Sequence, residues 1–194
     1  MSAPLGYVFW HWPRSGIDQR GYEKRLAKFE TSLKAHRPEG LVDALSFRVQ
    51  GLPWVRARSS VCEDWYVVRD YGSLGALNES AVSNANKKTH DEVAREASGG
   101  AGGLYKLRIE GIPLGEARFA AWIRKPVRTT YEAFMEDLSK LVGDRRTDLW
   151  QRQMVLGPAP EFCIHSESRI TFPRSFHSTN VPLRLIMTTR RGSS

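Results

Sequence analysis

The sequence has little cysteine, and its two cysteines, Cys62 and Cys163, lie far apart in a chain of 194 residues. Two distant cysteines do not make the framework of bridges that stabilises small secreted domains. Cys and His residues do not follow the spacing of a zinc site, so we expect no metal site. A chain of this length can bury ~70% of its unfolded surface, and it needs neither device to fold.

Long hydrophobic runs are also missing. No stretch approaches the length needed to cross a bilayer, so we expect no membrane-spanning segment. The first residues lack the basic region and apolar core of a secretory signal, and the cytoplasm is the expected location. Hydrophobic residues make up 41% and charged residues 26% of the chain, which is ordinary for a globular protein and argues against disorder.

Acidic residues are in deficit: there are 21 against 29 lysines and arginines, a net charge of +8. Half of this excess lies at residues 166–194, where five arginines face one glutamate, a balance of +4. Elsewhere the two signs alternate, as on solvated helix faces. A diffuse positive potential can attract anions, but it identifies no partner, and we do not expect nucleic acid to be one.

A phosphate-binding turn is absent as well. The glycine run from Gly99 to Gly103 follows a predicted helix and precedes a predicted strand. Dinucleotide and P-loop turns run in the opposite direction, from strand to helix, so that helix amides meet the phosphate. We therefore expect these glycines to end a helix and not to bind a nucleotide.

What the sequence does have is one plan used twice. An aromatic strand at Tyr7–Trp12 precedes a helix over Tyr22–Ala35, and a strand at Phe119–Arg124 precedes a helix over Tyr131–Val142. Both helices open on Tyr-Glu, and their apolar residues recur at the helical spacing of three and four. These residues match at one constant offset: Leu26, Phe29 and Leu33 against Met135, Leu138 and Val142.

The other elements complete two units. Alternating patterns predict first-half strands at 44–52, 65–68 and 104–109. Residues 73–97 are predicted to be helical in two pieces, capped by Ser73 and Thr89 and separated at 84–88. Second-half strands are predicted at 149–156, 161–165 and 183–189, with an irregular stretch at 166–181 and a frayed end at 190–194. The expected units are residues 1–113 and 114–194.

Strand, helix, strand, strand, helix, strand is the order of the ferredoxin-like unit. Two such units in tandem, with their paired Tyr-Glu helices, resemble the dimeric α+β barrel superfamily. The resemblance implies an α+β fold whose antiparallel sheets pack face to face around a cavity, the second unit lacking a full second helix. It further implies a choice among cofactor-independent monooxygenases, isomerases and haem-binding enzymes.

Three shorter runs carry a second resemblance. Trp10–Pro13, Leu77–Glu79 and Trp150–Cys163 are similar to a group of uncharacterised bacterial proteins. This likeness implies no activity, and whether the chain is an enzyme stays open.

His11 is the candidate for chemistry. It alternates with Tyr7 and Phe9 on one face of a strand, and that face would line the cavity if it is the inner one. There His11 could act as a general base or bind haem, although a buried structural histidine is the commoner case. No cofactor is otherwise expected. The candidate ligand-binding set combines aromatic and polar strand residues that could hold a carboxylate or carbonyl group: Trp10, His11, Arg48, Gln50, Gln151 and Gln153.

Three further pairs have simpler interpretations. Cys163 and His165 share a strand face, but no nucleophile signature surrounds them. His90 and Asp91 lie in the first turn of a predicted helix, where an acid stabilises the helix dipole. Glu63 and Asp64 precede a predicted strand, where an acid/base pair competes with an ordinary solvated strand entry.

The sequence thus favours a small-molecule binder with an apolar or aromatic ligand between the two sheets, either a cofactor-independent monooxygenase or an isomerase. An RNA-binding module is the alternative, because the RRM is also ferredoxin-like, but residues 62–68 do not match its signature. A ligand-free structural protein and a homodimer stay open. Any pocket entrance is expected beside the irregular stretch at 166–181.

Overall fold

The computed structural model describes residues 3–57, 60–154 and 157–188, and the frayed end expected at 190–194 lies outside them. The first half of the chain runs β1 (Leu5–Pro13), α1 (Gln19–Ala35), β2 (Leu41–Val49), β3 (Val61–Val68), α2 (Tyr71–Ala81), α3 (Asn84–Glu96) and β4 (Ala97–Ile109). The second half runs β5 (Phe119–Ile123), α4 (Tyr131–Val142), β6 (Thr147–Arg152), β7 (Phe162–Ser166), β8 (Ser178–Pro182) and β9 (Arg184–Thr188). Short 3-10 turns lie at Leu114–Glu116 and Arg174–Phe176.

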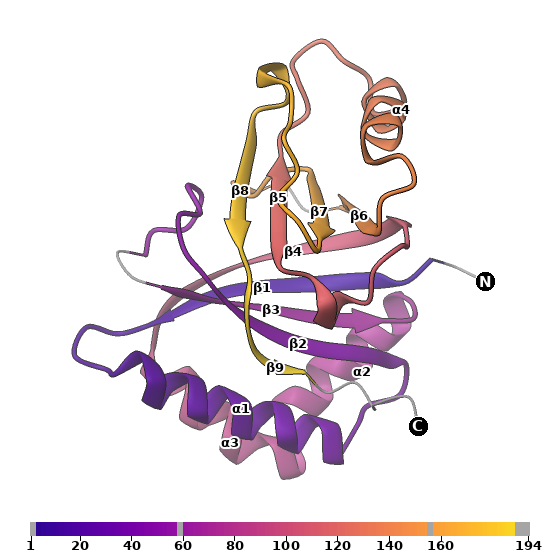
Figure 1. Ribbon diagram of the computed structural model, residues 1–194. Helices are drawn as coiled ribbons and strands as arrows, with labels where there is room; N and C mark the ends of the chain where they lie inside the picture. The colour runs from indigo at the N-terminus through magenta and orange to yellow at the C-terminus, as the bar shows by residue number, and fades with distance from the viewer. Residues whose placement is uncertain (1–2, 58–59, 155–156, 189–194) are drawn as a thin grey trace.

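Each half has the strand order of a ferredoxin-like unit. The first-half strands lie in the order β4-β1-β3-β2, and those of the second half in the matching order β8-β5-β7-β6. All the pairings within and between these units are antiparallel. Helices α1, α2 and α3 cover the first unit, whereas α4 alone lies beside the second (Figure 1). The predicted α+β fold of two tandem units, the second without a full second helix, is confirmed. The division at residue 113 stays a prediction.

The nine-stranded sheet closes through its last two strands. β4 pairs with β6 and joins the two units, so that β8 and β9 form the two ends of the strand order. These two strands are consecutive in the chain and are separated only by Leu183, whose N–H donates to the carbonyl of Arg118 (2.8 Å). One stretch of chain therefore pairs with β5 and then with β2, and it bridges both edges of the sheet in the manner of a barrel.

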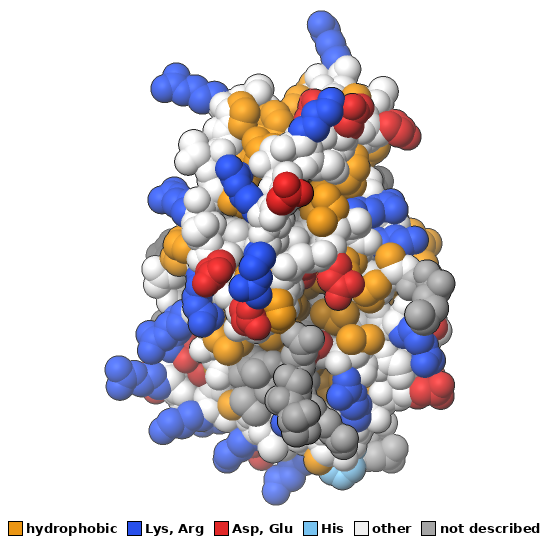
Figure 2. All heavy atoms as spheres, turned by 45° about the vertical axis from the view of Figure 1, so that its right-hand side comes forward, with side chains coloured by type: hydrophobic (Ala, Val, Ile, Leu, Met, Phe, Trp, Pro, Cys, Tyr) orange, Lys and Arg blue, Asp and Glu red, His pale blue; other side chains and the backbone are white. Residues whose placement is uncertain are grey.

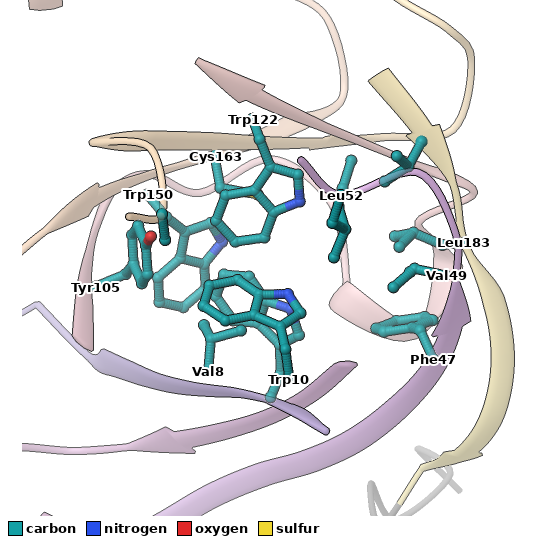
Figure 3. Packing of buried hydrophobic residues seen from close by; sticks show 14 of the residues in the cluster. Val8, Trp10, Phe47, Val49, Leu52, Tyr105, Trp122, Trp150, Cys163 and Leu183 are labelled. Carbon is teal, nitrogen blue, oxygen red and sulfur yellow. The ribbon is translucent and has the colours of Figure 1, made fainter. Parts of the chain in front are cut away.

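The inner face of this barrel is packed with indole rings. Trp10, Trp65, Trp122 and Trp150 are all at most 2% exposed. Their rings lie against one another, with Trp122 5.1 Å from Trp10 and 6.0 Å from Trp65 between centroids. Figure 3 shows Trp10, Trp122, Trp150 and Tyr105 pointing toward the same interior space. Aromatic packing of this density fills the region between the two halves of the sheet, where we had expected the ligand cavity.

The glycine run lies inside a strand, which corrects the prediction that it ends a helix. β4 begins at Ala97, and it pairs with β1 through Gly99, Gly100, Gly102 and Gly103. Aromatic rings of β1 occupy the space that side chains would take: an added Cβ at Gly100 would lie 2.6 Å from Cζ of Phe9. Glycine is accepted in this strand because its neighbour's rings cover it.

Helix starts follow the capping side chains. Thr130 caps α4, accepting from the N–H of Ala133 (3.2 Å). Asp70 caps α2 in place of the predicted Ser73, whose N–H donates to Asp70 Oδ1 (2.8 Å). The predicted break at 84–88 is wrong, since α3 runs through it and places Thr89 inside the helix. In the described chain, no helix is long and apolar enough to span a membrane.

Charged side chains are dispersed over the surface. On the face drawn in Figure 2, lysines and arginines are spread from end to end, with aspartates and glutamates between them. Several of these groups form exposed ion pairs, including Arg146 with Glu116 (2.7 Å) and Lys140 with Glu136 (2.7 Å). Pairs of this kind contribute little to stability.

Candidate functional site

A cavity of about 900 Å³ lies between the outer face of the first unit's sheet and helices α1, α2 and α3. Its location corrects the expected one, because it is on the opposite side of the sheet from the barrel interior. Side chains alternate along β1, so Trp10 enters the barrel while His11 faces the helices. The cavity wall is rich in rings: Tyr7, Phe9, Tyr22, Phe29, Tyr66 and Tyr71.

His11 is the centre of a hydrogen-bonded chain in this wall. Its Nδ1 lies 2.6 Å from Oη of Tyr22, and its Nε2 lies 2.9 Å from Oδ2 of Asp64. Strand β1 supplies the histidine, α1 the tyrosine and β3 the aspartate. All three line the cavity, and none is more than 2% exposed. We call Tyr22, His11 and Asp64 the proton relay.

The protons of the relay can be placed from its chemistry. An ionised carboxylate only accepts hydrogen bonds, so the N–H of His11 lies on Nε2 and donates to Asp64. Nδ1 is then an acceptor, and Tyr22 donates its hydroxyl proton to it. Burial, the Cys62 sulfur and the charge of Asp64 all raise the pKa of Tyr22, so this phenol keeps its proton unless another group supplies one in exchange.

A second buried acid lies behind the relay. Tyr66 donates to Asp64 Oδ2 (3.3 Å), and Ser46 donates to Oε1 of Glu30 (3.0 Å). Glu30 is fully buried. Burial, followed by the negative charge of Asp64, raises its pKa to about 8. Glu30 is therefore mostly protonated at neutral pH.

The predicted ligand-binding residues are not brought together. Trp10 is in the barrel, where its indole N–H donates to Glu63 (2.8 Å). Arg48 forms a bidentate pair with Glu23. The three glutamines bond elsewhere: Gln50 to Ser60, Gln151 to Arg108, and Gln153 to the carbonyls of Gln151 and Arg152. Of the six candidates, His11 alone lines the 900 Å³ cavity; ligand binding by the other five stays a prediction without a shared cavity.

Cys163 and His165 face the barrel interior. The Sγ atom lies 3.7 Å from Nε2 of the histidine, and both residues are fully buried. Burial raises the pKa of the thiol and lowers the pKa of His165 to about 3. Since both groups are neutral and neither residue lines the cavity, this pair has neither the thiolate nor the access that a nucleophile needs.

Glu63 and Asp64 lie within β3, which starts at Val61, so the interpretation as a solvated strand entry is wrong. Their side chains point to opposite faces. Asp64 joins the relay, whereas Glu63 accepts hydrogen bonds from the indoles of Trp10 (2.8 Å) and Trp65 (2.9 Å) inside the barrel. Burial raises the pKa of Glu63 to about 7. The two acids are not an acid/base pair acting on one ligand.

His90 lies farther along the cavity wall. It belongs to α3, its Nδ1 is 3.3 Å from Oδ1 of Asp91, and about a third of its side chain is exposed (33%). Asp91 also pairs with Lys87 (2.8 Å), so it stabilises the helix surface. The prediction that Asp91 stabilises the helix dipole from the first turn is wrong, because α3 begins at Asn84 and Asp91 lies beyond its first turn.

The equivalent place in the second unit is filled. Behind α4, rings of Phe134 and Phe162 pack at 5.4 Å in a T-shaped contact. The irregular stretch at 166–181 contributes Ile170, Phe172 and Phe176 to the same cluster. Tyr131, the sequence counterpart of Tyr22, is 45% exposed. In the part of the chain that the structure describes, side chains therefore fill the place in the second unit that the cavity takes in the first. No residue of 166–181, where the entrance was expected, lines that cavity.

Haem fits this cavity poorly. Both ring nitrogens of His11 already have partners, so neither is free to bind iron. The lining residues include no arginine or lysine to pair with the haem carboxylates. No step of the chemistry below depends on haem.

The fold occurs in solved structures of other proteins. A candidate monooxygenase from Lactobacillus acidophilus NCFM superposes with a TM-score of 0.65 at 10% identity, covering 96% of this chain and 95% of that one. An anthrone oxidase-like protein gives 0.56 at 12% identity, covering 97% and 94%. A candidate chlorite dismutase gives 0.54 at 12% identity, covering 95% of each chain. No protein-family model matches the sequence, and no curated protein does. At these identities the likeness shows a shared α+β fold and no activity.

Proposed function

We propose that this chain is a cofactor-independent enzyme, a monooxygenase or isomerase, that binds a small apolar or aromatic molecule in the helix-covered cavity and removes a proton from it. One observation carries this proposal: a buried Tyr-His-Asp relay opens into a ring-lined space of about 900 Å³. Mostly apolar pockets with a few convergent polar groups are the usual form of small-molecule sites. The neighbouring folds named above include a candidate monooxygenase, which agrees with this class.

The relay would act through Tyr22. A substrate proton moves to Oη of Tyr22 while the phenol passes its own proton to Nδ1 of His11. Asp64 then stabilises the imidazolium through the hydrogen bond at Nε2. This is the division of roles found in a Ser-His-Asp triad, with a phenol in place of the serine hydroxyl. Burial strengthens each of these interactions because water cannot screen them.

Removal of a C–H proton next to a carbonyl group gives an enolate, and removal of the O–H proton of a phenol gives a phenolate. Such an anion can take back a proton at another carbon, which is the outcome of an isomerase. It can instead react with molecular oxygen, which is the outcome of a monooxygenase. Both reactions begin with the same proton transfer.

The RNA-binding alternative is not favoured by this fold. An RRM binds RNA through aromatic residues on the open face of its sheet. Here that face is the inside of the barrel, and its tryptophans are at most 8% exposed at Trp10, Trp54, Trp65, Trp122 and Trp150. A cytoplasmic location remains part of the proposal, and a homodimer is compatible with it.

A substitution that fills the cavity tests ligand binding. Gly75 in α2 lines the cavity, and a Cβ added there meets nothing within 4 Å. We expect Gly75→Phe to weaken binding of β-naphthol more than about tenfold in calorimetry. The matched control is Gly72→Phe in the same helix, outside the lining, which should bind as the parent does. Equal binding by parent and Gly75→Phe would place the ligand elsewhere.

Proton transfer can be tested with β-tetralone, an uncharged aromatic ketone with an acidic C–H. The protein should accelerate exchange of that hydrogen for deuterium, as followed by NMR. His11→Ala and Tyr22→Phe should each lower the rate by about 10²–10⁴-fold, the usual contribution of general base catalysis. Cys163→Ala, which lies in the barrel, is the control. If His11→Ala exchanges the ketone as fast as the parent, the relay does not carry out the reaction.

A further inference from the structure

We infer that the ligand of the cavity carries a protonated amine. The aromatic wall and Asp64 bind this amine at the end of the cavity where Tyr22, His11 and Asp64 lie, which we call the relay end. The inference rests on the proposed function and adds to it the chemical class of the substrate.

At the relay end, the side-chain hydrogen-bond donors already have partners within the protein, whereas some of the acceptors do not. Tyr22 donates to His11, His11 donates to Asp64, and Tyr66 donates to the same carboxylate. A lone pair on the phenol oxygen of Tyr22 remains free for a ligand. Oδ1 of Asp64 is buried and has no hydrogen-bond partner among the residues that the structure describes. A ligand must therefore bring donors, and an ammonium group brings three donors and no acceptor.

The charge at this end is negative although the protein is basic. Besides burial, the charge of Asp64 raises the pKa of Tyr7, Tyr22 and Tyr66, all of which line the cavity. Arginine and lysine are absent from the lining residues. An anionic ligand would lose its hydration here without gaining a cationic partner. A cationic ligand would gain the carboxylate of Asp64 as its partner.

The rings of the wall suit a cation as well. Tyr7 stacks between Phe9 and Tyr66, with centroids 6.4 Å apart in both pairs and interplanar angles of 12° and 25°. All three rings line the cavity, together with those of Tyr22, Phe29 and Tyr71. An ammonium group that reaches the open face of one of these rings is held by cation–π attraction.

The relay gives the bound ammonium a reaction. One N–H bond of the ligand breaks, and its proton goes to Tyr22 Oη as the phenol proton moves to His11 Nδ1. The nitrogen keeps the electron pair, so the products are a neutral amine and an imidazolium paired with Asp64. Atoms and charge balance without an added reagent. The free amine is the electron-rich form in which nitrogen compounds react.

Three matched probes test the inference: naphthylethylamine, naphthylethanol and naphthylacetate, which share one ring system and differ in the terminal group. In calorimetry at neutral pH the amine should bind about tenfold more tightly than the alcohol, and the acetate about tenfold more weakly. Asp64→Asn should lower the affinity for the amine to that for the alcohol, and the affinity for the alcohol should not change. Glu79→Gln, an exposed acid on the same cavity-forming helix α2, is the control and should retain the preference.

A second variant keeps the test informative if Asp64→Asn does not fold. Tyr7→Leu leaves the carboxylate in place and removes a ring, so the preference for the amine should fall several-fold. Equal affinity of parent protein for amine and alcohol overturns the amine inference and leaves the cavity proposal intact. Binding of none of the three probes, together with no effect of Gly75→Phe on β-naphthol, overturns the proposed function itself.

Discussion

Replacing Trp122 by alanine is expected to lower the free energy of unfolding by about 3–5 kcal/mol, the usual cost of removing a fully buried large ring. Trp122 is 0% exposed and lies at the centre of the barrel interior. The centroid of its ring lies 5.1 Å from that of Trp10, 5.5 Å from that of Trp54 and 6.0 Å from that of Trp65. Because Trp122 belongs to the second unit and these neighbours belong to the first, the cavity left behind cannot be closed by a movement of one strand.

Guanidinium denaturation followed by far-UV circular dichroism measures this loss without depending on tryptophan emission. Trp122→Phe, which keeps a ring, should lose less than the alanine variant. Val127→Ala is the surface control, since Val127 is 89% exposed, and its effect should stay within about 0.5 kcal/mol. A loss below about 1 kcal/mol for Trp122→Ala would show that the units do not share a rigid interior.

Glu30→Gln is expected to stabilise the protein at alkaline pH. The carboxyl group has a pKa of about 8 in the fold, against an ordinary value of 4.5. The folded state therefore keeps a proton that the unfolded chain has already released, and stability falls as pH rises from 4.5 to 8. Glutamine does not titrate, so the variant should gain on the order of 2–4 kcal/mol over the parent at pH 8, and this gain should disappear toward pH 4.5.

Unfolding measured at several pH values between these limits gives the slope of stability for each protein. The control is Glu39→Gln, whose side chain is 87% exposed and whose stability curve should follow the parent. Glu63, with a pKa of about 7, and His165, with a pKa of about 3, contribute equally to parent and variant, so they cancel in the difference. Parallel curves for the parent and Glu30→Gln would mean that Glu30 is ionised in the fold.

Much of the fold could be predicted because local patterns and tertiary packing agree. The Tyr-Glu helices and the aromatic strands have periodicities that their final positions confirm. β8 was not predicted, since Ser178–Pro182 is short and mostly polar, and only its pairing with β5 makes it a strand. The glycine run was misread for a related reason: rings supplied by β1 compensate for its missing side chains.

The site was harder to predict than the fold. Strand alternation placed His11 with Tyr7 and Phe9, which is correct, but alternation does not say which face meets the helices. Asp64 was missed as its partner because two adjacent acids suggested a solvent-exposed strand entry. The signal that could have found it is the strand Cys62, Asp64, Tyr66, whose alternate residues share one face. The sequence shows Tyr22 and Tyr131 as equivalent first residues of the two Tyr-Glu helices. Only the structure shows that Tyr22 is buried while Tyr131 is exposed.

The bridging segment formed by β8 and β9 also bears on how the chain reaches this fold during synthesis. The first unit's strand β2 has its outer edge paired by residues 184–188, the last part of the chain that the structure describes. On a ribosome, that edge stays open until these residues have left the exit tunnel. The nascent chain can collapse locally, yet the sheet can close only after nearly all the described residues have been made. Chaperones that shield exposed strand edges would be most useful to this protein in that interval.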